Sequence, residues 1–294
     1  MALLMLIDGQ SLVSRAFFAL PTDIKTRSGQ VTNAVYGFTA MFVQLLRDYG
    51  PGRIAVAFDA PGPGFRTGLL PGYRATRYDP PEALRQQLGL VRQVAEAMQL
   101  PVLEAPEYQA ADVLASLATK AAAADEDVVV VTGDSNAYQL VADPYVKVLY
   151  SRRAVSDFVL YDEAGIVGRT GVSPCQYPDF AALRGDTFDN VVGVPGVGEK
   201  TAARLLRAYG CIDGLYAHLP ELAPGRLYDS LAACEAQVRA NARALPLVVD
   251  VPVNLGPHDG VVGRWDLDRV KELFLTLEFG ALWDRFAKAA APYA

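Results

Sequence analysis

The sequence predicts an α/β protein with a doubly wound, mostly parallel sheet, followed by a region of short helices. Three short apolar runs, at residues 3–7, 53–58 and 127–131, are the predicted strands, and an aspartate follows at or near the end of each. Continuous apolar strands suit a parallel sheet that is covered on both faces. Helical patterns lie between these runs, and such alternation of strand and helix is typical of doubly wound sheets.

The helical patterns are stripes of apolar residues at three- and four-residue spacing. They span residues 38–46, 84–98 and 114–121, and they indicate core-facing helices with no functional role. After about residue 172 the pattern changes to short helices joined by Gly- and Pro-rich turns, and a last amphipathic helix covers residues 270–277. We therefore predict two domains, 1–172 with the sheet and 173–294 with helices.

Composition limits the classes of function. About half of the 294 residues are apolar and a fifth are charged, which is typical of soluble globular proteins. No apolar run approaches the roughly 18–20 residues of a membrane span, so we expect no membrane association. Three scattered cysteines and two histidines argue for reduced thiols in the cytoplasm and against a zinc site or a Ser-His-Asp triad. The net charge of −6 does not by itself predict nucleic-acid binding.

Three aspartates follow the predicted strands. Asp8, Asp59 and Asp134 each stand at a carboxyl end, and the carboxyl edge of an open α/β sheet is where ligands bind. Three converging carboxylates repel one another unless a cation such as Mg²⁺ neutralises them. The alternative is that Asp8 and Asp134 only cap the following helices. Asp186 and Asp189, three residues apart in a later loop, either complete this site or form a capped turn.

A glycine-rich turn spans residues 193–201, with the sequence G-V-P-G-V-G-E-K-T. Its glycines permit close approach to a ligand, and the helix that follows it presents free backbone amides to a phosphate. This helix-hairpin-helix pattern predicts a grip on a DNA backbone without base reading, whereas the alternative is an ordinary helix–helix turn. The residues predicted to bind DNA here are Gly196, Gly198, Lys200, Thr201 and Arg204.

A basic segment lies between the second predicted strand and the next helix, at about residues 60–84. Arginines interleave with aromatic residues there, and arginine binds phosphate bidentately while aromatic rings stack on exposed bases. The segment is either a solvated loop or a clamp over the acidic site. Its predicted DNA-binding residues are Arg66, Tyr73, Arg74 and Arg77.

Together these features resemble the 5′-nuclease (flap endonuclease) family, most closely the 5′→3′ exonuclease domain of bacterial DNA polymerase I. The match runs nearly end to end, and we expect a free-standing version. The resemblance implies a PIN-like sheet domain with a helix-hairpin-helix domain, in a cytoplasmic, nucleoid-associated bacterial monomer that acts on DNA. The matching segments are L-I-D-G at Leu6–Gly9, R-A-F-F-A-L-P at Arg15–Pro21, T-N-A-V-Y-G-F at Thr32–Phe38, A-V-A-F-D at Ala55–Asp59, Y-P-D-F-A-A-L-R-G-D at Tyr177–Asp186 and L-E-F at Leu277–Phe279.

The resemblance also implies a two-metal phosphodiesterase site. Asp8, Asp59, Asp134, Asp186 and Asp189 match its metal ligands, and Asp112 and Arg74 match further catalytic positions. Three ligand positions depart from the family pattern, however.

At those positions Gln109, Ala111 and Asn136 stand where the family has carboxylates, and Arg74 replaces a lysine. Because lost carboxylates weaken metal binding, we expect at most one weakly held Mg²⁺ or Mn²⁺ ion. Ser135 departs from the pattern as well, which favours natural divergence over designed substitution. The resemblance further implies K⁺ in the glycine-rich turn, on the carbonyls of Val194 and Val197.

Three functions follow as hypotheses. The favoured one is binding of branched, nicked or flap DNA with cleavage lost or strongly reduced. The second is an active Mg²⁺- or Mn²⁺-dependent 5′→3′ exonuclease or flap endonuclease in replication or repair. The third is a protein-interaction scaffold that has also lost DNA binding.

Overall fold

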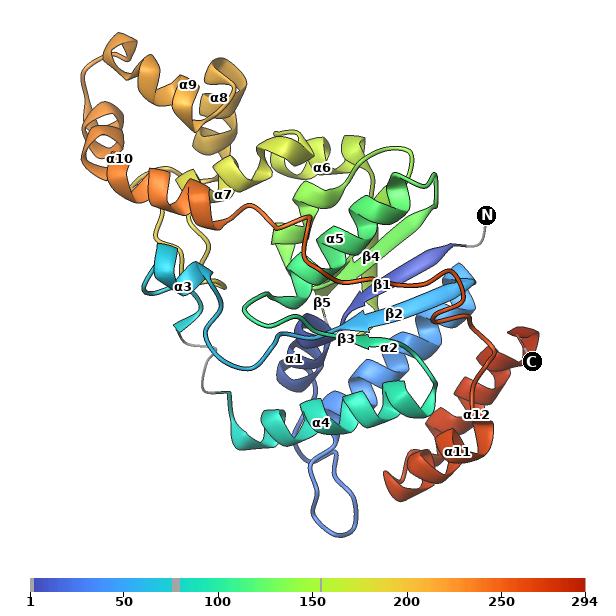
Figure 1. Ribbon diagram of the computed structural model, residues 1–294. Coiled ribbons are helices and arrows are strands. Elements are labelled where there is room, and N and C mark those ends of the chain that lie inside the picture. The colour runs from blue at the N-terminus through green and yellow to red at the C-terminus, as the bar shows by residue number, and fades with distance from the viewer. Residues whose placement is uncertain (1–2, 76–79, 154, 294) are drawn as a thin grey trace.

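The computed structural model describes residues 3–75, 80–153 and 155–293. Its centre is a six-stranded sheet with strand order β3-β2-β1-β4-β5-β6 (Figure 1). All neighbouring strands pair in parallel except β6, which runs antiparallel to β5. The strands are β1 (Leu4–Asp8), β2 (Arg53–Ala57), β3 (Val102–Leu103), β4 (Val128–Thr132), β5 (Val146–Arg153) and β6 (Asp157–Tyr161). The predicted α/β class and the three predicted strands are confirmed.

Helices cover both faces of the sheet, as continuous apolar strands require. Along β1, Leu4 and Leu6 join the core on the α5 side, whereas Met5 and Ile7 join the core beneath α1, α2 and α4. This alternation places successive side chains on opposite faces. The helices of this part are α1 (Gly9–Ala19), α2 (Asn33–Tyr49), α3 (Arg66–Leu69), α4 (Glu82–Ala97), α5 (Ala110–Ala122) and the 3₁₀ helix η2 (Ser135–Leu140).

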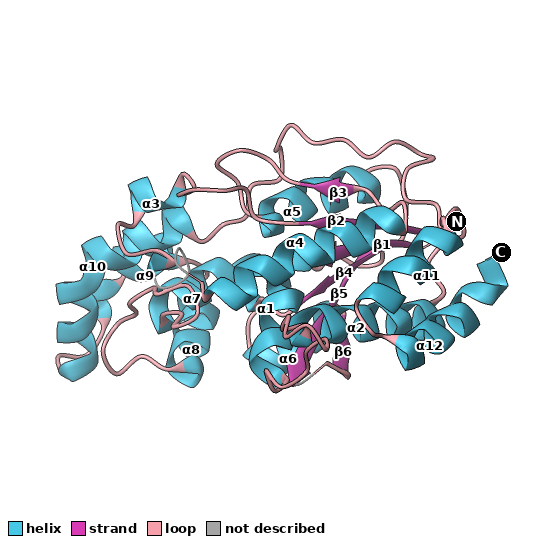
Figure 2. Cartoon of the chain, turned by 90° about the horizontal axis from the view of Figure 1, so that it is seen from below, coloured by secondary structure: helices cyan, strands magenta, loops and turns pink. Residues whose placement is uncertain are grey.

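A second, helical lobe follows the sheet and stands beside its carboxyl edge (Figure 1, yellow to orange; Figure 2). Its core joins that of the α5 side, so the two lobes share one continuous apolar cluster. The lobe consists of α6 (Glu163–Thr170), η3 (Pro174–Gln176), α7 (Tyr177–Arg184), α8 (Glu199–Tyr209), α9 (Ile212–Ala217), η4 (Leu219–Glu221) and α10 (Arg226–Ala244).

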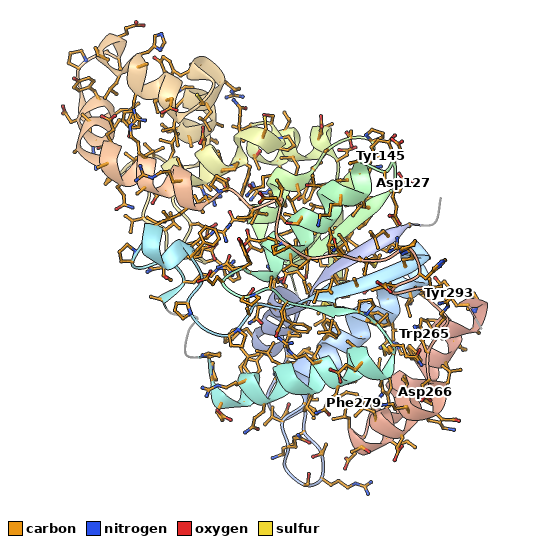
Figure 3. All side chains as sticks on the ribbon, in the orientation of Figure 1. Asp127, Tyr145, Trp265, Asp266, Phe279 and Tyr293 are labelled. Carbon is orange, nitrogen blue, oxygen red and sulfur yellow. The ribbon has the colours of Figure 1, made fainter. Side chains whose placement is uncertain are left out.

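The last helices differ from the prediction that residues 173–294 pack as one helical unit. After α10 the chain runs back along the sheet domain, and α11 (Leu267–Thr276), α12 (Gly280–Ala290) and η5 (Ala291–Tyr293) pack against α2 and α4. The Phe279 ring lies 5.4 Å from that of Tyr36, and the Tyr293 hydroxyl donates to the carbonyl of Leu46. Figure 3 labels Phe279 and Tyr293 on this part of the chain. The amphipathic pattern predicted α11, but it predicted neither α12, which follows α11, nor the surface that these helices cover.

A helix that crosses a membrane must be both long and apolar. Among the described residues, no helix combines the length and the apolarity that a bilayer span requires.

Candidate functional site

The carboxyl edge of the sheet holds the predicted aspartates, and each of the first three accepts a hydrogen bond from a backbone amide in the first turn of a helix. Asp8 ends β1, where its Oδ1 accepts from the Ser11 amide that opens α1 and its Oδ2 accepts from the Thr132 hydroxyl at 2.7 Å. Asp59 accepts from the amide of Ala110 at 2.8 Å, at the start of α5, and Asp134 accepts from the amide of Asn136 in η2. Asp8 and Asp134 thus cap the helices that follow them, and one oxygen of Asp59 and one of Asp134 face other partners.

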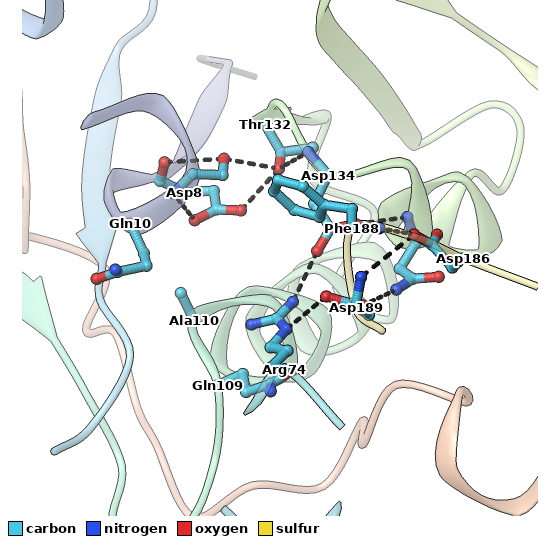
Figure 4. Close-up of polar contacts among 12 residues, drawn as sticks. Asp8, Gln10, Arg74, Gln109, Ala110, Thr132, Asp134, Asp186, Phe188 and Asp189 are labelled. Carbon is cyan, nitrogen blue, oxygen red and sulfur yellow. Dashed lines mark hydrogen bonds and ion pairs between the residues drawn. The ribbon is translucent and has the colours of Figure 1, made fainter. Parts of the chain in front are cut away.

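The guanidinium of Arg74 lies among three of the carboxylates. Figure 4 shows its contacts with Asp134 and Asp189. Its Nε is 2.6 Å from Asp189 Oδ1, its Nη2 is 2.9 Å from Asp134 Oδ2, and its Nη1 is 3.5 Å from Asp59 Oδ2. Arg74 is 6% exposed. Burial disfavours its charge, but the carboxylates, led by Asp189, outweigh burial and hold the pKa of Arg74 well above its ordinary value. The cation at the centre of these carboxylates is therefore a side chain of the protein itself.

Asp189 and Asp186 come from the loop before the glycine-rich turn and have different surroundings. Asp189 is fully buried, and its Oδ2 accepts from the Tyr73 hydroxyl and from Asn136 Nδ2 at 2.7 Å. Asp186 Oδ1 instead accepts from the amides of Phe188 and Asp189, which closes the local turn. Burial, together with the nearby Asp189 charge, raises the pKa of Asp186.

The three positions at which the sequence departs from the carboxylates of the family pattern are all buried beside the aspartates. Gln109 caps α5, and its Oε1 lies 3.2 Å from the Tyr73 hydroxyl oxygen. Ala111 lines the cleft described below, and Asn136 donates to Asp189 while its Oδ1 has no hydrogen-bond partner in the described part of the chain. All three side chains are neutral, so they add no charge that could balance a divalent ion.

Arg66 and Asp112 form a buried ion pair, which corrects two predictions. The guanidinium of Arg66 meets both oxygens of Asp112, at 2.6 and 2.7 Å, and it also donates to the carbonyls of Ala244 and Pro246 at the end of α10. Arg66 is 2% exposed and Asp112 is fully buried. In this conformation Asp112 faces a structural partner rather than the cleft, and Arg66 has no free face for a phosphate.

Tyr73 and Arg74 are buried as well, so the part of the predicted clamp that the structure describes presents none of Arg66, Tyr73 and Arg74 to solvent. The reason is that the α10 end and the 186–190 loop close over this segment, a long-range contact that its sequence does not show. Arg77 lies outside the described residues.

A divalent metal can be tested against this arrangement. Within residues 3–75, 80–153 and 155–293, no three acidic, histidine or cysteine side chains are placed to hold an ion. Asp59, Asp134 and Asp189 converge on a guanidinium instead, because Arg74 reaches the place where their charges would otherwise repel. The residues present therefore do not fit a two-ion centre, and the predicted five-carboxylate ligand set is not assembled here.

A cleft of about 620 Å³ opens on this edge. Asp8, Asp59, Asp134 and Arg74 line it, and so do three aromatic residues that sequence analysis missed: Phe18, Tyr108 and Phe188. Phe18 is 74% exposed and Phe188 is 44% exposed. Phe18 belongs to an apolar pair in α1 that looks like core, so nothing local in the sequence marks it as a surface residue.

The glycine-rich turn joins α7 to α8 as predicted. Gly193 has no room for a side chain, since a Cβ there would lie 2.3 Å from the carbonyl carbon of Arg184, and Gly196 has φ +83°. Gly198 is the N-cap residue of α8. Lys200 and Arg204 are exposed on α8, whereas Thr201 is half-buried.

The valines predicted to hold K⁺ are buried in the same turn. The amide of Val197 donates to the carbonyl of Val194 at 3.0 Å, so this carbonyl already has one internal partner. The K⁺ site stays a prediction.

Comparison with known proteins agrees with this fold along its length. Residues 3–171 match the 5′-3′ exonuclease N-terminal, resolvase-like domain, and residues 172–268 match the 5′-3′ exonuclease C-terminal SAM fold. The chain belongs to the 5′-3′ exonuclease family. It is 45% identical over 283 residues to DNA polymerase I of Mycobacterium bovis and 32% identical over 288 residues to DNA polymerase I of Bacillus subtilis.

Those alignments cover 96% and 98% of this chain but 31% and 32% of the polymerases, so the chain spans about a third of their length. Among solved structures, T5 5′-exonuclease with bound zinc superposes with a TM-score of 0.67 at 19% identity, covering 99% of both chains. The catalytic core of Rad2 in complex with DNA superposes with a TM-score of 0.60 at 16% identity, covering 99% of this chain and 92% of that one. At these identities the structures support the fold of the family.

Proposed function

We propose that this chain binds DNA at 5′ flaps, nicks or branches and that its two-metal phosphodiester cleavage is lost or strongly reduced. The observation that carries the proposal is the Arg74 guanidinium, which forms ion pairs with Asp59, Asp134 and Asp189. Family membership supplies the expectation of cleavage, and this arrangement removes the charge balance that cleavage needs.

Two-metal catalysis uses a pair of ions roughly 3.5–4 Å apart to stabilise the attacking and leaving oxygens. Arginine brings one positive charge, spread over a plane, and it stays protonated at working pH. It can neither polarise a phosphodiester as a divalent ion does nor generate a hydroxide. A divalent ion would also have to displace hydrogen bonds as short as 2.6 Å from buried carboxylates. We propose at most one weakly held Mg²⁺ or Mn²⁺ ion, at the exposed side of Asp59.

DNA binding is proposed from the turn before α8. Gly198 has no side chain to cap the first backbone amides of α8, and the exposed Lys200 and Arg204 add two positive charges on the same helix. Such contacts hold a phosphate backbone in any sequence context. The Rad2 core, which shares this fold, has been solved with DNA substrate. A K⁺ ion on the carbonyls of Val194 and Val197 would add a further positive charge at the turn.

The test is a pair of assays on the same 5′-flap DNA. A gel shift at low salt without divalent metal should show a complex, and incubation with Mg²⁺ or Mn²⁺ should leave the DNA intact. Cleavage that Asp134→Ala abolishes would establish an active nuclease instead. Failure of the parent protein to shift flap, nicked or branched DNA would favour the scaffold hypothesis.

A further inference from the structure

A second cavity is lined by residues of η2, β5, β6, α6, α7 and α8. Its volume is about 190 Å³, and three arginines line it: Arg152, Arg169 and Arg184. It also contains four tyrosines whose rings form one cluster around Tyr138, with ring centres 5.2–5.3 Å from it. None of these residues belongs to the predicted acidic site or to the predicted DNA-binding set.

Two of the four tyrosines offer hydroxyl donors that the described residues do not use. Tyr138 is 4% exposed and lines the cavity, and its hydroxyl makes no hydrogen bond with the described residues; the same holds for Tyr161. Burial raises the pKa of Tyr138, and burial raises the pKa of Tyr177 to about 12. The Tyr138 and Tyr177 phenols therefore stay protonated at working pH, and a protonated phenol donates to an anion.

The arginines are bridged by a carboxylate of the protein itself. Glu199, the first residue of α8, places one oxygen 3.4 Å from Arg169 Nη1 and the other 3.2 Å from Arg184 Nη1. Glu199 is nearly half exposed, so water screens both pairs and they are weak. Two outer carboxylates also touch the arginines, Asp157 at Arg152 and Asp186 at 3.7 Å from Arg184, but neither lines the cavity.

We propose that this cavity is a phosphate site, which the Glu199 carboxylate occupies in the free protein and which a backbone phosphate of bound DNA takes over. Guanidinium groups match the oxygens of a phosphate, and each has five N–H donors, more than the present contacts use. Exchange of one anion for another keeps the arginines paired throughout. The DNA part of this inference rests on the proposed function; the anion site does not.

The position of Glu199 connects the cavity to the predicted DNA grip. It precedes Lys200 at the start of α8, so a strand held at the turn amides passes the mouth of the cavity. When the phosphate displaces Glu199, the start of α8 loses its tie to Arg169 on α6. The cavity thus provides a second, independent contact to the same strand.

Inorganic phosphate tests the anion site without DNA. We expect the parent protein to bind it, seen as broadening of the ³¹P resonance, and we expect Tyr138→Phe/Tyr161→Phe to weaken binding while the ring cluster stays packed. Glu199→Gln removes the internal competitor and should tighten binding about threefold, on the scale of one screened ion pair. Phosphate binding that is absent from the parent, or equal in all three proteins, would overturn the site.

Salt dependence tests the DNA contact. Arg169→Ala should weaken flap-DNA binding about two- to fivefold. It should also reduce the magnitude of the negative slope of log K against log salt by about 1, the signature of one lost phosphate contact. Arg47→Ala is the matched control, because Arg47 is also an exposed arginine in the last turn of a helix, paired with the single carboxylate of Asp48. It should leave both quantities unchanged.

The two proposals fail in different ways. If the parent protein binds inorganic phosphate but no DNA, the proposed function is wrong and the anion site stands. If the parent binds DNA and Arg169→Ala leaves the slope unchanged, DNA does not enter the cavity and the inference is wrong while the proposed function stands.

Discussion

The Nε atom of Arg74 lies 2.6 Å from Oδ1 of Asp189, which is fully buried. This contact joins the segment after α3 to the loop before the glycine-rich turn, two parts of the chain more than a hundred residues apart. The backbone supports it, since the Arg74 amide donates to the carbonyl of Asp189 at 2.9 Å. Arg74 therefore has both an electrostatic and a structural role in the site.

Removal of Arg74 should make the stability of the protein depend on metal. Arg74→Ala leaves Asp59, Asp134 and Asp189 without their shared cation, so we expect a loss of about 3–5 kcal/mol of unfolding free energy in EDTA. Mg²⁺ or Mn²⁺ should then raise the melting temperature of the variant, since a ligand that binds only the folded state stabilises it. The parent protein should show little metal dependence, and an equal metal response in both proteins would contradict the role assigned to Arg74.

Arg66 should contribute to stability and not to DNA affinity. Arg66→Met leaves Asp112 charged and buried, with an expected cost of about 3–5 kcal/mol in a urea titration. Arg47→Ala, which breaks an exposed pair, should cost less than about 1 kcal/mol. A variant at Arg66 that keeps its stability but loses DNA affinity would restore the clamp prediction.

Asp8 should make stability fall as pH rises. Burial raises the pKa of the Asp8 carboxyl despite the hydrogen bonds from Ser11 and Thr132. The folded protein therefore holds this proton more tightly than the unfolded chain does, so stability is lost as pH rises from the ordinary aspartate pKa through the raised one. Asp8→Asn keeps a capping oxygen and removes the charge, and it should be more stable than the parent at pH 7 by on the order of 1 kcal/mol.

Urea titrations of both proteins at pH 4, 5.5 and 7 check this prediction. The difference should be smallest at pH 4 and grow with pH. A difference that is constant with pH would mean that the carboxyl of Asp8 titrates normally.

The helix after the glycine-rich turn should bind phosphates irrespective of sequence. Lys200→Ala/Arg204→Ala should weaken binding to flaps of different sequence by the same factor. It should also reduce the magnitude of the slope of log K against log salt by about 2. The control is Arg285→Ala/Lys288→Ala on α12, which removes two exposed cations from the far end of the molecule (Figure 1). Gel shifts at four salt concentrations give both slopes, and equal slopes for the two variants would rule out this surface.

Local patterns predicted much of the fold and the chain positions of the acidic site. Continuous apolar runs gave β1, β2 and β4 within one residue at each end, and their carboxyl ends placed Asp8, Asp59 and Asp134 on one edge. The glycine spacing gave the turn before α8. These features depend on neighbouring residues, which is why the sequence alone reveals them.

The partners of the basic segment depend on distant parts of the chain and were not predictable. An arginine beside an aromatic residue looks the same whether it meets a phosphate or an aspartate. Arg66 meets Asp112 of α5, and the second lobe folds back over the segment to bring the α10 carbonyls to Arg66 and Asp189 to Arg74. The exposed ring of Phe18 is likewise decided by what covers α1 and not by its apolar neighbours.

The most direct test of the filled acidic site is the number of Mn²⁺ ions that the parent protein binds, counted by electron paramagnetic resonance of free Mn²⁺ during a titration. With Arg74 among the carboxylates, the protein should bind at most one ion, and only weakly. Two tightly bound ions with the spectrum of a spin-coupled pair would show that Arg74 yields its place to metal, and the account of a non-cleaving DNA binder would be wrong.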